Sequence, residues 1–190
     1  MATDNPSRGT GGESADGVAT ALKQIAEFES EAGPTPLTTV VRVLGRTRAF
    51  ALVYRTLMPK LDVGLARSTD GWAAAHVFGL PFLLLTSLGA KTGQPRTSPL
   101  IYRRDGEDFL VVGTNWGQPK HPGWAAKWLA HPDATIEVGP ATLGVRAELV
   151  PAEEFDRLFA RFVEIYAGYA NYLDRRGTLP PRMFRLTPTG

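Results

Sequence analysis

Short apolar runs separated by turn residues dominate the second half of the chain and predict six β-strands. These runs span residues 82–87, 96–103, 109–114, 134–139, 141–150 and 182–188. Gly106 and the pair Gly139 and Pro140 mark hairpin turns between neighbouring runs. Because the strands follow one another without a βαβ rhythm, we expect an antiparallel barrel with inserted helices. The fold class is therefore α+β, with β structure in the majority.

Apolar positions at helical spacing predict helices in the rest of the chain. The expected helices are 19–31, 46–67 with a bend at Pro59, 121–132, and one long helix over 151–177. Pro122 is expected in the first turn of the third helix. The long helix begins at Pro151 and stops at Gly177.

These patterns divide the chain into three parts. Residues 1–17 lack large apolar side chains and are expected to be disordered, 18–67 to form N-terminal helices, and 68–190 to form the barrel domain. The basic amphipathic segment 46–67 either packs on the core or leans on a membrane surface or a lipophilic substrate. Residues 71–90 carry no formal charge, but Pro81 would break a spanning helix, so we expect a loop that enters a buried strand.

Composition excludes several kinds of chemistry. The chain has 190 residues, no cysteine and a formal net charge of +2. Disulfides, thiol nucleophiles and iron–sulfur ligation are therefore excluded, and the charge gives no support for nucleic-acid binding. The three histidines show no metal-binding spacing, so we expect no metal site. With no apolar segment at the N-terminus, we expect a cytoplasmic protein.

The basic loop "SLGAKTGQPRTSP" at residues 87–99 is the first candidate site. It fails the Walker pattern, because Ala90 precedes Lys91 and Leu85 occupies the upstream glycine position. A turn that exposes backbone N–H groups between Lys91 and Arg96 can nevertheless bind an anion. The alternative is that these cations are only solvated.

Three stretches together resemble the deazaflavin-dependent nitroreductase family, whose members include quinone reductases. They are "LLLTSLGAKTGQPRTSPLIY", "FLVVGTNWGQPKHPGWAAKWLAHPDATIEV" and "YAGYANY", and the resemblance covers roughly residues 45–187. It implies a split β-barrel related to flavin-binding barrels and the cofactor coenzyme F420, used as F420H2. The phosphodiester and glutamate tail of F420 are polyanionic, and arginine can bind phosphate in a bidentate manner.

The resemblance also implies which residues bind the cofactor, by carrying each family position onto this sequence. The loop, the second strand, the end of the third strand and the following helix supply Ala90, Lys91, Thr92, Arg96, Thr97, Ser98, Pro99, Leu100, Ile101, Val112, Gly113, Thr114, Asn115, Gly123, Trp124, Ala125, Ala126 and Lys127. Lys120, by its charge near the start of that helix, and Tyr169, on the long helix, complete the set of predicted cofactor residues. Many members have lysine at the position of Asn115, and Lys120 or Lys127 can compensate for that missing charge.

Tyr166, Tyr169 and Tyr172 form a second constellation, at a spacing of three on the expected long helix. They either pack in the core or, as the resemblance implies, border the acceptor pocket, with Tyr169 as the candidate catalytic residue. The resulting hypothesis is hydride transfer from F420H2 to a flat lipophilic acceptor such as a quinone, with nitroaromatics as further acceptors. The alternatives are an FMN-binding barrel oxidoreductase and a noncatalytic binder of F420 or of a lipophilic ligand. We expect a monomer or a homodimer, with peripheral membrane contact left open.

Overall fold

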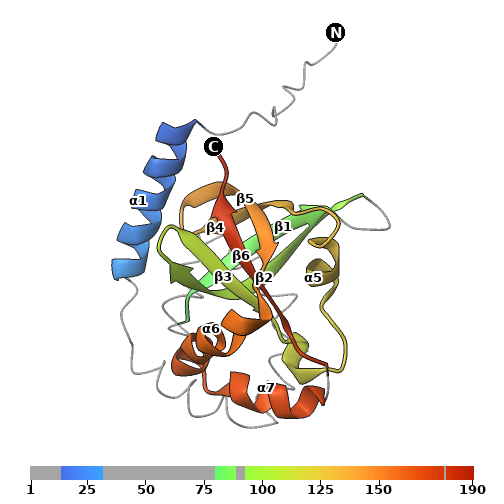
Figure 1. The fold of residues 1–190 in the computed structure, drawn as a ribbon. Coiled ribbons are helices and arrows are strands. Elements are labelled where there is room, and N and C mark those ends of the chain that lie inside the picture. Colours follow the sequence, from blue (N-terminus) through green and yellow to red (C-terminus); the bar gives the residue numbers. More distant parts are fainter. Residues whose placement is uncertain (1–13, 32–79, 89–92, 178) are drawn as a thin grey trace.

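Six antiparallel strands close into a barrel. A computed structural model describes residues 14–31, 80–88, 93–177 and 179–190, which Figure 1 shows as coloured ribbon. The strands are β1 (Phe82–Leu88), β2 (Pro95–Asp105), β3 (Asp108–Gly113), β4 (Asp133–Val138), β5 (Ala141–Leu149) and β6 (Arg182–Pro188). Their order around the barrel is β1-β2-β3-β6-β5-β4. The predicted barrel and all six predicted strands are confirmed, with shifts of a residue or two at their ends.

Side chains alternate between two hydrophobic clusters, which is the pattern expected of strands buried on both faces. On β3, Phe109 and Val111 belong to the cluster that fills the barrel, together with Leu143 of β5 and Phe184 of β6. The intervening Leu110 and Val112 belong to a second cluster outside the barrel. This outer cluster lies beneath the helices that follow β5.

A pair of helices, α6 (Ala152–Ile165) and α7 (Gly168–Arg176), covers the outer cluster (Figure 1). The single helix predicted over 151–177 is wrong, because the chain leaves helical geometry at Tyr166, where φ is −146° and ψ is 98°. A Cβ at Gly168 would collide with the Tyr166 ring. Glycine at this position therefore lets the Tyr166 ring fold back over the start of α7.

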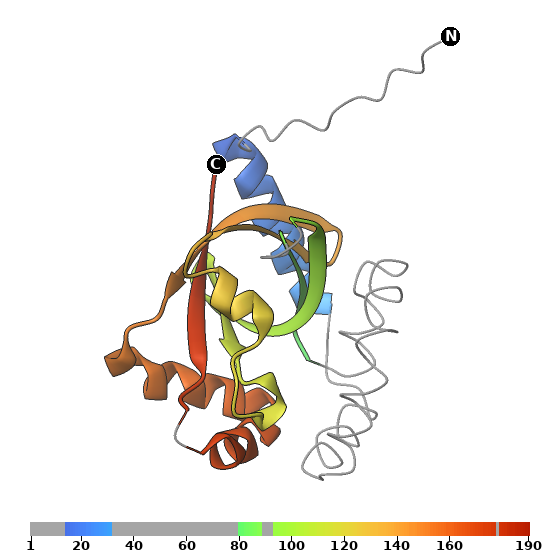
Figure 2. The same ribbon diagram turned by 90° about the vertical axis from the view of Figure 1, so that its right-hand side faces the viewer.

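Two further α-helices lie at opposite ends of the barrel. Figures 1 and 2 show α1 (Ala15–Glu31) on one side and α5 (Gly123–Lys127) across the opposite opening. The hydroxyl of Tyr102 inside the barrel donates a hydrogen bond of 2.6 Å to Glu29 Oε1 and so ties α1 to β2. The structure corrects two predicted boundaries. The first helix begins at Ala15, so 15–17 are helical, and α5 is shorter than 121–132, with Pro122 as its N-cap.

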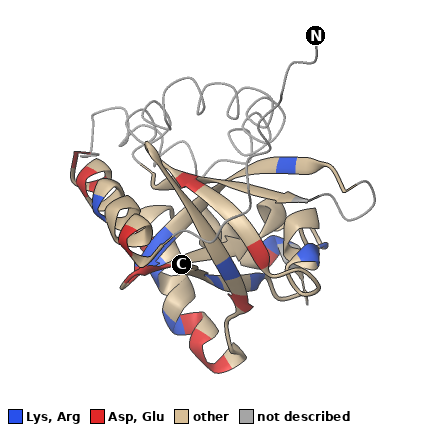
Figure 3. Ribbon diagram, turned by 90° about the horizontal axis from the view of Figure 1, so that it is seen from above, with Lys and Arg blue, Asp and Glu red and all other residues tan. Residues whose placement is uncertain are grey.

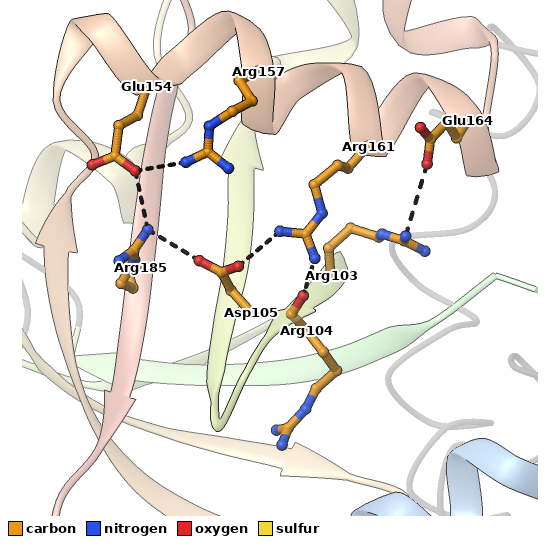
Figure 4. A network of polar contacts seen from close by, with 8 residues as sticks. All are labelled: Arg103, Arg104, Asp105, Glu154, Arg157, Arg161, Glu164 and Arg185. Carbon is orange, nitrogen blue, oxygen red and sulfur yellow. Dashed lines mark hydrogen bonds and ion pairs between the residues drawn. The ribbon is translucent and has the colours of Figure 1, made fainter.

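A network of ion pairs attaches α6 to the β2–β3 hairpin and to β6 (Figure 4). The Asp105 carboxylate accepts a hydrogen bond from Arg161 of α6 at 2.8 Å and forms an ion pair with Arg185 of β6 at 3.1 Å. Arg161 also donates to the backbone carbonyl of Arg104. Arg185 approaches Glu154 at 3.5 Å. One carboxylate therefore joins a hairpin, a strand and a helix.

Several expectations for the N-terminal third lie outside the described residues. The helix predicted over 46–67 is among them. Of the segment 71–90, for which a loop entering a strand was expected, the structure describes residues 80–88, and 82–88 forms β1. Of the helices in the described ranges, none combines the length and apolar character needed to cross a membrane. Acidic and basic positions are interspersed over the described elements (Figure 3), as expected for a net charge of +2.

Candidate functional site

The first half of β2 carries a block of candidate residues and separates from β3. Residues 95–101 pair with β1, whereas β3 pairs with β2 only from Tyr102 to Asp105. In the part of the chain that the structure describes, the opposite edge of residues 95–101 is therefore not covered by a strand. We call this gap in the pairing of β2 with β3 the split, and the candidates Arg96, Thr97, Ser98, Pro99, Leu100 and Ile101 all lie along it.

Alternate residues on this stretch face the two clusters already described. Leu100 packs against the cluster inside the barrel, and Ile101 packs against the outer cluster. By alternation, Arg96 and Ser98 lie on the inner side and Thr97 and Pro99 on the outer side. Thr97 Oγ1 lies 2.9 Å from Thr86 Oγ1 of β1, a hydrogen bond that fixes the outer side of this strand pair.

The end of β3 and helix α5 form the second part of the candidate site. A Cβ at Gly113 would lie 3.2 Å from Pro122 Cγ and 3.4 Å from Ala125 Cβ, so glycine allows α5 to pack tightly on β3. Ala125 is fully buried, and Trp124 stacks edge-on with Trp128, which is itself packed on Phe184. Two of the predicted cofactor residues, Trp124 and Ala125, therefore also close the barrel end.

A turn with two left-handed residues connects β3 to α5. Asn115 and Trp116, in the short helix η1 (Asn115–Gly117), have φ of 48° and 58° and are the non-glycine residues of positive φ in the described ranges. Such conformations cost about 1–3 kcal/mol each and persist only where the surroundings hold them. The Asn115 side chain contributes by donating from Nδ2 to the Lys120 carbonyl at 3.1 Å.

Trp116 was missed by the sequence reasoning. It stands next to the predicted Asn115 and packs edge-on against Tyr172, with ring centroids 6.1 Å apart. Gly117 makes this possible, because its missing Cβ would lie 2.9 Å from Arg175 Cβ and 3.2 Å from the Tyr172 backbone. The only sequence signal was a tryptophan followed by glycine within a predicted loop, which does not specify a partner helix.

The segments around the split carry positive charge only. Residues 93–101 and 112–132 contain no Asp or Glu, but they contain Arg96, Lys120 and Lys127. Arg96 and Lys120 are exposed, and among the described residues Arg96 and Lys127 form no ion pair. This donor set suits the phosphodiester and carboxylates of the expected cofactor. Ala90, Lys91 and Thr92 lie outside the described residues. The dipole of α5 adds little to anion binding, because α5 has only five residues and is shorter than predicted.

The three tyrosines form one buried aromatic cluster. Tyr166, Tyr169 and Tyr172 are 6%, 6% and 3% exposed, and the Tyr166 and Tyr172 hydroxyls lie 3.3 Å apart in a hydrogen bond. Burial raises the pKa of all three phenols above the ordinary value. They therefore stay protonated at neutral pH and can donate hydrogen bonds. Tyr166 lies in the break between α6 and α7, whereas Tyr169 and Tyr172 lie on α7. The three tyrosines are therefore not brought together by regular spacing along one helix, as the sequence predicted.

Two of the predicted cofactor residues share a hydrophobic cluster with the three tyrosines. Ile101 of β2 and Val112 of β3 belong to the same outer cluster as the tyrosines, and Trp116 links that cluster to the turn before α5. Thr114, between Val112 and Trp116 in the sequence, is buried. Gly123 and Ala126, by contrast, are exposed on α5. The site thus combines a cationic segment with an aromatic wall, and no conventional nucleophile is needed to explain its residue types.

Comparison with known proteins identifies the family. The sequence profile of the F420H(2)-dependent quinone reductase family matches residues 58–182. An F420H(2)-dependent quinone reductase of Mycobacterium tuberculosis is 39% identical over 122 residues, which cover 61% of this chain and 80% of that protein.

Two solved structures share the fold. An F420-H2 dependent reductase (FDR-A) superposes with a TM-score of 0.50 at 31% identity, covering 56% of this chain and 93% of that one. A protein described as a domain-swapped dimer superposes with a TM-score of 0.52 at 30% identity, covering 67% and 93%. With a matching profile over most of its length and a confirmed barrel, the chain belongs to the F420H(2)-dependent quinone reductase family.

Proposed function

We propose that the protein is an F420H2-dependent reductase whose acceptor is a quinone. The observation that carries this proposal is the meeting of two features at the split between β2 and β3. A segment with cations and no carboxylates adjoins a buried aromatic cluster, in a chain of the quinone reductase family. The first feature fits a polyanionic cofactor, and the second fits a flat lipophilic acceptor.

The cationic residues would hold the anionic end of F420. Arg96 at the start of β2, Lys127 on α5 and Lys120 before it are placed to bind the phosphodiester and glutamates, with Lys91 as a fourth candidate outside the described residues. Pro99, Ile101 and Val112 provide an apolar surface for the ring system. When bound, reduced F420 supplies a hydride, and with one proton this reduces a quinone to the hydroquinone.

The protein contributes binding, orientation and hydrogen bonds to the reaction. Because burial raises the pKa of Tyr169 and Tyr172, these phenols act as hydrogen-bond donors to a developing quinol oxyanion, not as bases. Tyr169 is the candidate donor within the cluster, and solvent supplies the proton that completes the hydroquinone. Nitroaromatics are proposed as further acceptors of the same hydride.

Assembly and location belong to the proposal as well. A homodimer is favoured by the structural relative described as a domain-swapped dimer. A lipophilic quinone resides in membranes, and the basic amphipathic pattern of residues 46–67 would favour peripheral contact with an anionic membrane surface.

Equilibrium binding tests the cofactor assignment before any turnover is measured. The protein should bind F420 and should bind FMN much more weakly, because a single phosphate engages fewer cations. Arg96→Ala should weaken F420 binding by about 1–3 kcal/mol, as expected for a charged hydrogen bond. Arg157→Ala is the control, since Arg157 lies on α6 and pairs with Glu154 at 3.1 Å. Micromolar FMN binding without F420 binding would favour the FMN alternative.

A further inference from the structure

We propose that Arg175 promotes quinone reduction by strengthening the Tyr166 and Tyr172 hydroxyls as hydrogen-bond donors to the developing quinol oxyanion. Arg175 is a positioning residue in this scheme, because it acts through the phenols and not by touching the acceptor. This inference rests on the proposed function, which assigns oxyanion stabilisation to the buried phenols and assigns no role to Arg175.

The guanidinium of Arg175 lies beside the aromatic cluster. Its Cζ is 5.9 Å from the centroid of the Tyr172 ring, within the range of a cation–π contact. The Tyr172 hydroxyl lies 3.3 Å from the Tyr166 hydroxyl. Arg175 is exposed on α7, whereas Tyr172 is only 3% exposed. The cation therefore lies on the solvent side of a buried pair of phenols.

Close packing against the turn after β3 holds the stem of Arg175. A Cβ at Gly117 would lie 2.9 Å from Arg175 Cβ, so glycine is what allows this approach. The same Cβ would lie 3.2 Å from the Tyr172 backbone. Arg175 is thus fixed at its base by the turn and at its head by the Tyr172 ring, which restricts where its charge can go.

The charge of Arg175 acts on the two phenols. Among the described residues Arg175 forms no ion pair, not even with its exposed neighbour Asp174. Burial raises the pKa of Tyr166 and of Tyr172, and the positive charge of Arg175 is one of the effects that oppose the rise. The guanidinium therefore stabilises negative charge at the phenol oxygens, and it makes their O–H groups stronger donors.

The phenol pair can offer a proton to a further acceptor. Either hydroxyl can donate in the bond between Tyr166 and Tyr172. With Tyr166 as the donor, the O–H of Tyr172 is left over, because the Tyr172 hydroxyl has no other hydrogen-bond partner in the described part of the chain. Tyr172 is also the phenol whose ring Arg175 overlies.

A cation at this place favours the transition state over the bound substrate. When a quinone accepts a hydride, an electron pair moves to a carbonyl oxygen, which stays an oxyanion until solvent supplies a proton. A neutral quinone gains little from a nearby positive charge, whereas the oxyanion gains much more. An interaction that is stronger in the transition state raises kcat and leaves KM nearly unchanged.

Three substitutions separate the charge of Arg175 from its packing. Arg175→Gln removes the charge, Arg175→Lys keeps it, and Arg175→Met keeps an unbranched stem without it. Arg157→Gln is the control, since it makes the same change at an exposed arginine that pairs with Glu154 on α6. We would measure kcat and KM for menadione with F420H2, and the dissociation constant of F420. Arg175→Gln would also be combined with Tyr172→Phe, which keeps the ring and removes the hydroxyl.

The expected result is a loss of kcat that follows charge. Arg175→Gln should lower kcat about tenfold, as expected for one partly screened unit charge. Arg175→Lys should lower it by no more than about threefold, and Arg157→Gln should leave it unchanged. The KM for menadione and the affinity for F420 should change by less than about twofold. Combined with Tyr172→Phe, the effect of Arg175→Gln should shrink to about twofold, because the hydroxyl that carries it is gone.

A binding measurement tests the same idea without turnover. Lawsone is a naphthoquinone that is ionised at neutral pH, so it resembles the anion formed by hydride addition, whereas menadione is neutral. Calorimetry should show that Arg175→Gln weakens lawsone binding about tenfold and leaves menadione binding unchanged.

Each other outcome counts against a specific statement. An effect of Arg175→Gln that is as large with Tyr172→Phe as without it would overturn the inference. A loss of F420 affinity that matches the loss of kcat would also overturn it, and would assign Arg175 to the anionic tail of the cofactor. If Arg175→Gln does not fold, Arg175→Met decides by the same measurements.

Failure of the proposed function is distinguishable from failure of this inference. A wild-type protein that oxidises no F420H2 with menadione would overturn the proposed function. The ratio of lawsone to menadione affinity would then decide the role of Arg175 separately, and an unchanged ratio in Arg175→Gln would overturn that role.

Discussion

Replacing Asp105 by asparagine should destabilise the protein, because one carboxylate joins three elements. Asp105 Oδ1 accepts a hydrogen bond from Arg161 at 2.8 Å, and Oδ2 forms an ion pair with Arg185 at 3.1 Å. The side chains of Asp105, Arg161 and Arg185 are only 28%, 29% and 31% exposed. Hydrogen bonds to charged groups contribute about 1.5–3 kcal/mol each. In Asp105→Asn the amide oxygen can still accept one hydrogen bond, and Arg185 keeps its ion pair with Glu154. The expected loss in the free energy of unfolding is therefore about 2–3 kcal/mol.

The matched control is the exposed pair Asp133 and Arg146. Its N–O distance is 3.0 Å, which is comparable, but Arg146 and Asp133 are 55% and 74% exposed. Exposed pairs contribute only about 0–1 kcal/mol, so Asp133→Asn should change stability by no more than that. The two variants therefore differ in burial and in the number of partners.

Urea denaturation at neutral pH measures both free energies of unfolding, and thermal melting provides a second readout. For a protein of this size, a loss of about 2–3 kcal/mol lowers the melting temperature by about 4–12 °C. If Asp105→Asn and Asp133→Asn agree within about 0.5 kcal/mol, the network does not attach α6 to the barrel in the way its geometry indicates.

Two further predictions concern a close approach and the buried phenols. Gly117→Ala should lower the free energy of unfolding by about 2 kcal/mol or more, because φ is +75° and the new Cβ would lie 2.9 Å from Arg175 Cβ. Gly106→Ala is the control: φ is +67° but the space around it is open, so the loss should be only about 1 kcal/mol. Urea denaturation measures both losses, and equal losses would contradict the close packing of η1 on α7. Burial raises the pKa of Tyr102, Tyr166, Tyr169 and Tyr172, so their contribution to stability is complete below pH 10.0 and is lost as pH rises through the higher folded values. Ultraviolet titration should show tyrosinate appearing together with unfolding, and full ionisation near pH 10.0 in a folded protein would refute this.

The barrel was predictable because its signals are local. Each strand is a short apolar run, and Gly106 and Gly139 adopt positive φ of 67° and 56° at the hairpin turns that the sequence marked. Consecutive hairpins account for the pairs β1–β2, β2–β3 and β4–β5, whereas the pairs β1–β4 and β3–β6, which close the barrel, join strands far apart in the sequence.

The break between α6 and α7 was not predictable from periodicity. Apolar positions continue at helical spacing through Tyr166, and only the close approach of the Tyr166 ring to Gly168 reveals why the helix stops. The contact between Trp116 and Tyr172 was hidden for a similar reason, since Tyr172 lies far along the chain. Contacts of this kind depend on tertiary packing, which a local pattern does not encode.

The assignment of individual cofactor residues is a prediction. Arg96 lies on β2, Asn115 in the turn after β3 and Lys127 on α5, and Lys91 lies outside the described residues. Their roles follow from charge and from family membership, so the binding experiments above are what decide them.

Anaerobic turnover of F420H2 with menadione tests the central claim most directly. The account predicts that the wild-type protein restores the absorbance of the oxidised deazaflavin, at a rate that saturates with menadione and falls in Arg96→Ala. Tight binding of F420 with no oxidation by menadione or any other quinone would contradict it, and would leave a carrier of the cofactor as the better description.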